Sequence, residues 1–227
     1  LKSKTIRVNQ AQLRDANISV ELSDTVPPDT TKTPVYWKIK VDKLLVERSK
    51  AMIRTAGDTM VVLAEMPKLE AKNGYFDLFK NLYRIETLNW QDGSVNYDLT
   101  HKPRTDGLDP NHIRLTHLDL GVDSFYFCQP ELKMKVRVCA FKEKSGVQIN
   151  HFSTHVGLDS ARLDLPDLVL RTPESSVSAN FNMDMNAFDD NNPGKLYVAL
   201  HASLGKADLL REMGGMPEGF RKAFPNY

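Results

Sequence analysis

The sequence predicts a mostly β protein: an elongated, curved antiparallel sheet of repeated bulged hairpins that forms an open groove or taco-like half-barrel. Three observations lead to this prediction. Apolar residues recur with one spacing in four segments, turn-forming residues separate them, and helical periodicity is confined to a short stretch, 206–213. We expect residues 1–227 to form one continuous segment, because no loop is long enough to link independent domains.

The repeat has apolar residues at offsets 0, 2, 5, 7, 12 and 14 from its first residue, and a basic residue at offset 1. Its copies begin at Ile6, Ile39, Tyr83 and Ile113, so successive starts lie 33, 44 and 30 residues apart. Steps of two are typical of a strand with one buried face. A helix, which turns by about 100° per residue, would scatter these offsets around its circumference.

Two irregularities divide each copy. The step of three between offsets 2 and 5 predicts a β-bulge, since one extra residue keeps both halves on the same face. Turn formers such as Asp92-Gly93 lie between offsets 7 and 12 and predict a tight turn. Each copy is therefore predicted to be a bulged strand, a turn and a return strand.

The segments between and after the copies have similar patterns. A hairpin is predicted over 69–78 with its turn at Asn73-Gly74, and another is predicted to turn near Pro130. Loops are predicted where Asp, Asn, Thr, Pro and Gly gather, over 23–34, 100–111 and 189–194. Alternating apolar residues predict further strands over 60–66, 177–183 and 196–200. A fifth, degenerate copy is predicted to begin at 134–138 and to continue from Phe141 to Ile149, and the step of three recurs at 163–170 across Pro166.

The composition and charge of the chain indicate which classes of binding partner are to be expected. Hydrophobic residues make up 41% and charged residues 26%, which is ordinary for a globular protein, and the formal charge is +1. No long single-sign block occurs, so neither nucleic acid nor an anionic membrane is predicted as a partner. Cys128 and Cys139 are too few for a disulfide scaffold, and we expect both thiols to be free and buried. The chain starts at Leu1 and contains no long apolar run, so we expect it to be a piece of a longer protein.

No set of residues predicts catalysis, a metal or a cofactor. The motifs of serine hydrolases, nucleotide-binding loops and zinc proteases are missing from the sequence. His151 and His155 would lie about 13 Å apart on a strand, too far to share one ion. His112 and His117 are predicted to lie on different sides of the fourth copy, and the acidic stretch at 189–192 is predicted to be a solvated turn.

The candidate functional residues are the apolar positions of the second, third and fourth copies. Their periodicity alone favours the filled core of a sandwich or barrel. Repetition along one direction favours instead a long curved sheet whose apolar face lines an open groove, because each unit then contacts mainly its neighbours. The residues are Ile39, Val41, Leu44, Val46, Tyr83, Ile85, Leu88, Trp90, Val95, Tyr97, Ile113, Leu115, Leu118, Leu120, Phe125 and Phe127.

Residues 83–98, 112–120 and 163–172 resemble the repeats of the AsmA/TamB-like family of Gram-negative envelope proteins. The resemblance implies a large protein that is anchored in the inner membrane and extends through the periplasm. It also implies a non-enzymatic β-groove that carries phospholipid or another acyl-chain ligand toward the outer membrane, or that works with outer-membrane assembly proteins. The alternative is a structural or protein-binding β-sandwich module with a filled core, which joins its neighbours through exposed sheet edges.

Overall fold

The computed structural model describes residues 4–22, 36–55 and 59–208, and the strands among them belong to one sheet of 11 strands. From β3 onward, each strand pairs with the next one along the chain in antiparallel orientation. The strands are β1 (Lys4–Arg14), β2 (Asn17–Leu22), β3 (Trp37–Thr55), β4 (Val61–Asp77), β5 (Leu82–Asp98), β6 (His112–Cys128), β7 (Glu131–Glu143), β8 (Gln148–Leu158), β9 (Arg162–Arg171), β10 (Ser176–Asp184) and β11 (Leu196–Ser203).

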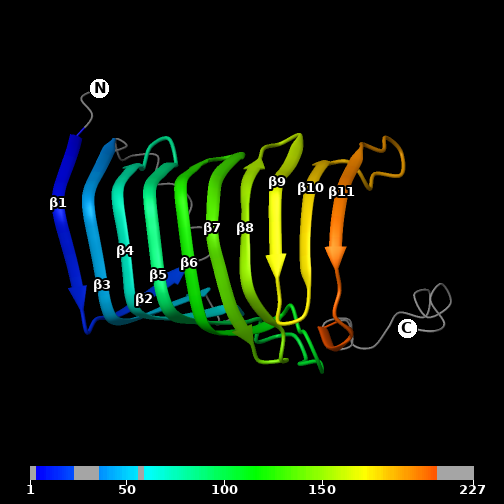
Figure 1. Cartoon of the computed structure of the whole chain (residues 1–227). Coiled ribbons are helices and arrows are strands. Elements are labelled where there is room, and N and C mark those ends of the chain that lie inside the picture. Colours follow the sequence, from blue (N-terminus) through cyan, green and yellow to red (C-terminus); the bar gives the residue numbers. More distant parts are fainter. Residues whose placement is uncertain (1–3, 23–35, 56–58, 209–227) are drawn as a thin grey trace, which may run out of the picture.

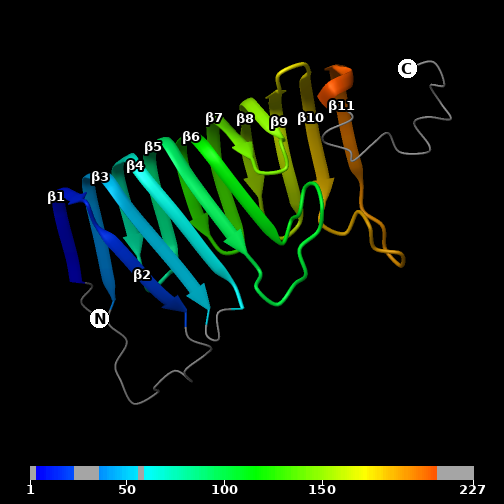
Figure 2. The ribbon, with the colours of Figure 1, turned by 90° about the horizontal axis from the view of Figure 1, so that it is seen from below.

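The sheet is open and bent. β1 and β2 form one edge and β11 forms the other, with no pairing between the two edges. The strands stand side by side and curve toward their lower ends (Figure 1). Seen from below, β2 and the second halves of β3 to β6 form a second wall that runs at an angle to the first (Figure 2). The predicted fold class, a mostly β protein with one open curved sheet, is confirmed.

Each complete copy of the repeat in the antiparallel part of the sheet is one long strand. The second, third and fourth copies lie within β3, β5 and β6, so the tight turn predicted inside each copy is wrong. The chain bends there without reversing: Arg48 and Asp92, both at offset 9, have positive φ angles of 47° and 49°. The hairpin turn predicted at Asn73-Gly74 is wrong for the same reason, since Asn73 (φ 52°) lies inside β4. Asp and Asn enter the left-handed region more easily than most residues, and pairing with both neighbours keeps the strand going.

The bulge predicted at the step of three is confirmed in the fourth copy. Between Leu115 and Leu118, β6 has one residue more than β5, and His117 has a φ of 52°. A bulge also occurs at Pro166-Asp167 in β9, where the Asp167 N–H donates to Asn180 Oδ1 at 3.0 Å.

In the first three copies the predicted bulge is wrong, because the register does not shift at that step. Where β3 takes a step of three from Val41 to Leu44, β4 takes a matching step from Gly74 to Ala71. In both strands the side chains switch faces at the same level of the sheet, so the pairing stays in register without an extra, bulged residue.

The first copy departs from the predicted antiparallel arrangement. β1 and β2 pair with β3 in parallel, and every pair is separated by 33 residues, the same interval that separates the starts of the two copies. Ile6 therefore lies beside Ile39, Leu13 beside Val46 and Val20 beside Ile53. A parallel pair requires a crossover connection rather than a tight turn. That connection, with the loop predicted at 23–34, lies outside the described residues.

The other sequence predictions have mixed outcomes. The loops predicted at 100–111 and 189–194 and the turn near Pro130 are confirmed. Cys128 and Cys139 are free, but both are only half-buried, and burial raises the pKa of the Cys139 thiol. The predicted helix begins at residues 206–208, and the rest of it lies outside the described residues.

Carboxylates organise the connections between strands by accepting backbone N–H groups. Asp159 accepts from Ala161 (2.7 Å) and Arg162 (2.9 Å) in the turn between β8 and β9. These hydrogen bonds favour the charged form and lower the pKa of Asp159 below its ordinary value of 3.8. Asp109 in the 100–111 loop and Asp184 at the end of β10 have their pKa lowered in the same way, chiefly by the backbone N–H groups of Thr105 and Lys195 respectively.

These carboxylates predict how stability depends on pH. Their pKa is lower in the folded state than in the unfolded state, so their contribution is present above about pH 4 and is lost as the pH falls through the folded values. We expect the Tm to decrease between pH 5 and pH 2, measured by circular dichroism at constant ionic strength. Asp159→Asn should reduce this dependence while lowering the Tm at pH 7. A variant with an unchanged pH profile would contradict this role of Asp159.

Candidate functional site

A continuous apolar row crosses ten strands of the sheet. Each member pairs with the next across adjacent strands, so all of them share one face and one level. Neighbouring strands lie about 4.8 Å apart, which makes the row about 43 Å long. We call it the first apolar ladder: Ile6, Ile39, Phe76, Tyr83, Phe127, Leu132, Leu158, Leu163, Met183 and Leu196.

A second row, the second apolar ladder, runs beside the first on the same face. Phe76, Tyr83 and Phe127 of the first ladder form a run of aromatic contacts, with ring centroids 6.2 and 6.1 Å apart. The second ladder has the half-buried Cys139 as its most polar member. Its members are Leu13, Val46, Leu69, Trp90, Leu120, Cys139, Phe152, Leu170, Val177 and Ala202.

The spacing of the repeat explains why these rows remain apolar. In an antiparallel pair of copies, the first residue of one copy lies opposite offset 14 of the other, offset 2 lies opposite offset 12, and offset 7 lies opposite offset 7. Apolar positions therefore face apolar positions. Tyr83 therefore faces Phe127, and Trp90 faces Leu120. In the parallel pair of copies each offset faces itself, so the apolar positions match there too.

The structure brings the sequence-predicted residues together on this face, and most of them remain partly exposed. Of the 16, only Val46 and Leu118 are buried, with 4% and 5% of their surfaces exposed. The other 14 are half-buried, although they lie in long, fully paired strands. In the described part of the chain no second sheet covers them, so the face is one wall of a single-layer structure and not half of a sandwich.

The inside of the bend is the most tightly packed part of the face. Ser49 has only 1% of its surface exposed, and it pairs with the buried Met66, while Gly93 pairs with Leu118. Arg48 and Lys50, the chain neighbours of Ser49, are exposed on the other side. Since the buried residues share the side of the apolar ladders, that side is concave at the bend. Ser49 and Gly93 were missed by the sequence reasoning because they lie at offset 10, which is not consistently apolar, and Met66 was placed in a predicted strand but not at the bend.

Trp90 closes the bend over Gly93. A Cβ atom at position 93 would lie 2.1 Å from Trp90 Nε1 and 2.4 Å from Cε2, so only glycine leaves room for the indole. The bend and the second ladder are thereby coupled through one side chain.

The opposite face is charged, and most of its charges are paired across strands. Arg14 binds Glu47 at 2.8 Å, and Arg137 binds Asp123 at 2.7 Å. The hydrogen bond from Arg14 is the main cause that lowers the pKa of Glu47. Exposed ion pairs of this kind contribute little stability, about 0–1 kcal/mol each, so this face serves mainly to keep one side of the sheet solvated.

The histidines do not gather into a metal site in the described part of the chain, which also lacks any other group of three or more His, Cys, Asp and Glu suited to an ion. His112 is buried and bonds Asp98 and the Lys102 carbonyl, whereas His117 is exposed and lies 2.9 Å from Asp92. His112 therefore anchors the 100–111 loop. Among the described residues no helix has the length and apolar character needed to cross a membrane.

Comparison with known proteins returns no match: no protein-family model, no curated protein and no solved structure matches the chain.

The coupling of Trp90 to the bend predicts the effect of Gly93→Ala. The added methyl group would displace the indole, so we expect a loss of about 1–3 kcal/mol in the free energy of unfolding and a shift in tryptophan emission. Urea denaturation followed by fluorescence measures both. Gly157→Ala is the matched control, because the nearest atom to its new Cβ is 3.7 Å away. Equal stability of the two variants would contradict the packing described for Trp90.

Residues of the apolar face differ in burial, so substitution by Asp should destabilise the protein to different extents at different positions. Leu118→Asp places a carboxylate inside the bend, where its desolvation should abolish cooperative unfolding. Ile85→Asp changes a half-buried wall residue and should cost only about 1–2 kcal/mol. Thermal melts of both variants measure the contrast. Equally severe effects would indicate that the whole face is packed as a closed core.

Proposed function

We propose that this chain is a non-enzymatic segment of an envelope-spanning groove protein, and that its apolar face binds and conducts the acyl chains of phospholipid. The observation that carries the proposal is the pair of apolar ladders, which cross ten strands without interruption on a face that stays partly exposed. With the resemblance to AsmA/TamB-like repeats, this supports a periplasmic protein anchored in the inner membrane that supplies lipid to the outer membrane.

The chemistry of the face suits acyl chains. Apart from the Tyr83 hydroxyl and the Cys139 thiol, the two ladders present only hydrocarbon, thioether and indole groups. The hydrocarbon core of a bilayer is about 30 Å thick, so one acyl chain is about 15 Å long and covers roughly a third of a 43 Å ladder. A chain that moves by one strand meets a similar surface again. Such repetition favours sliding over tight binding at one place.

The ladders are accessible at both edges of the sheet. Ile6 on β1 and Leu196 on β11 have 42% and 49% of their surfaces exposed. An acyl chain at either edge would therefore find apolar surface that leads into the ladder.

A second candidate function is protein binding through a sheet edge. Among the described strands, β11 is unpaired on one side, and Tyr197, Val198 and Leu200 are exposed on it. A strand of an outer-membrane assembly protein would add to this edge by main-chain hydrogen bonds.

The experiment that tests the groove is native mass spectrometry, with organic extraction, of the chain purified after expression in a bacterium. We expect phospholipid to accompany the wild-type protein. The double variant Val95→Asp, Leu115→Asp changes a half-buried cross-strand pair in the wall and should lose most of this lipid. Its matched control is Met52→Asp, Leu63→Asp, a cross-strand pair on the opposite face.

Circular dichroism of each variant establishes that it is folded. A lipid-free wild-type protein, or equal lipid loss from the two double variants, would contradict the groove. A lipid-free protein that self-associates through β11, with the association abolished by Val198→Pro, would favour the edge-binding candidate instead.

A further inference from the structure

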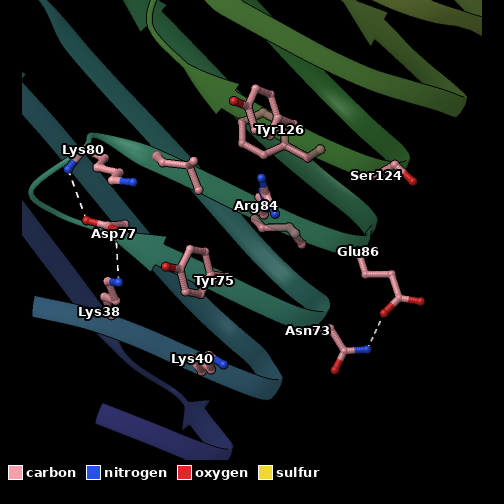
Figure 3. A pocket seen from close by; sticks show the side chains of 13 residues that line it. Lys38, Lys40, Asn73, Tyr75, Asp77, Lys80, Arg84, Glu86, Ser124 and Tyr126 are labelled. Carbon is pink, nitrogen blue, oxygen red and sulfur yellow. Dashed lines mark hydrogen bonds and ion pairs between the residues drawn. The ribbon is translucent and has the colours of Figure 1, made fainter. Parts of the chain in front are cut away.

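A hollow of about 730 Å³ lies on the charged face of the sheet, across β3 to β6. Figure 3 shows Arg84 between Tyr75 and Tyr126, with Lys40 beside Tyr75. By the alternation of side chains along a strand, these residues point away from the apolar ladders. Its volume is in the range of sites for small organic ligands. The remaining lining residues are Lys38, Asn73, Asp77, Lys80, Leu82, Ile85, Glu86, Ser124 and Phe125.

Cations and aromatic rings form one row through this hollow. Successive pairing across strands places Arg7, Lys40, Tyr75, Arg84, Tyr126 and Lys133 at one level, and none of the six is acidic. Lys40 Nζ lies 5.9 Å from the centre of the Tyr75 ring, and Arg84 Cζ lies 5.2 Å from that of Tyr126. The rings hold the cations in position by cation–π attraction and leave their charge uncompensated.

The acidic residues of the hollow are already engaged with other groups. Asp77 lies 3.9 Å from Lys38 Nζ and accepts the Lys80 backbone N–H at 3.1 Å, and Glu86 accepts from the Asn73 amide. In the described structure neither Lys40 nor Arg84 has a carboxylate partner. Four cationic side chains thus face two carboxylates, leaving an excess of two positive charges. Many other cations on this face are paired with carboxylates, as in Arg14–Glu47 and Lys50–Glu65.

We propose that this hollow is a binding site for a phosphate group, and that it acts independently of the apolar ladders, although Ile85 and Phe125 of the apolar face also contribute to its lining. The Arg84 guanidinium offers the planar fork that fits two phosphate oxygens, and Lys40 adds a second charge nearby. A sugar without charge fits less well, because cations already occupy a face of Tyr75 and of Tyr126. The phosphate would come either from a soluble phosphate compound or from a lipid headgroup at a membrane surface.

Two probes separate these sources. Inorganic pyrophosphate, titrated into the full chain by calorimetry, tests a soluble phosphate. Sedimentation with phosphatidylcholine vesicles, with and without phosphatidylglycerol, tests an anionic headgroup. We expect saturable binding of at least one probe that weakens with added salt. Binding of pyrophosphate alone identifies a soluble ligand, and binding of phosphatidylglycerol vesicles identifies a headgroup.

The test variant is Lys40→Gln, Arg84→Gln, which should bind the same probe at least tenfold more weakly. The matched control, Lys68→Gln, Arg171→Gln, removes one Lys and one Arg from exposed positions outside the hollow and should bind as the wild type does. Circular dichroism establishes that each variant is folded, and the single variant Lys40→Gln replaces the double variant if that one does not fold. The site is overturned if neither probe binds, if the test variant binds as tightly as the wild type, or if the control loses as much affinity.

Discussion

The structure depends on one constraint, the register between neighbouring strands. A shift by one residue would move every apolar side chain of a strand to the charged face. The constant pairing of β3 with β4, from Lys38 opposite Asp77 to Arg54 opposite Val61, keeps both faces intact over the length of the strands. The symmetry of the apolar offsets makes the same spacing compatible with parallel and antiparallel neighbours, as in the β1–β3 and β5–β6 pairs.

The bend converts this two-faced sheet into a trough. Left-handed residues such as Arg48 and Asp92 redirect their strands at one level, and the pairing on each side carries the bend from strand to strand. Small or compact residues are required on the inner side, where Gly93 accommodates the Trp90 indole. Val122 and Val136, at the level of Leu88, are also buried. Most members of the two ladders are only half-buried or exposed, so these parts of the walls remain available to a ligand.

The two faces have different chemistry and support separate proposals. On the inner face, the ladders provide a uniform apolar surface with almost no group that could distinguish one acyl chain from another. On the outer face, Lys40 and Arg84 contact tyrosine rings, whereas cations of other rows, such as Lys50, pair with carboxylates. The inner face is thus complementary to an acyl chain and the outer hollow to a phosphate group, as the two proposals require.

The sequence by itself determined the β class, the apolar face and most of its residues, because alternation along a strand is a local property of the chain. Only the tertiary structure decided that Asp92-Gly93 and Asn73-Gly74 bend their strands, since a left-handed residue either reverses a chain or redirects it according to what pairs on each side. It also decided the parallel pairing of β1 with β3, the burial of Ser49 inside the bend and the row that joins Lys40 to Arg84 through Tyr75. These features depend on which strands become neighbours, and spacing within one strand carries no information about that choice.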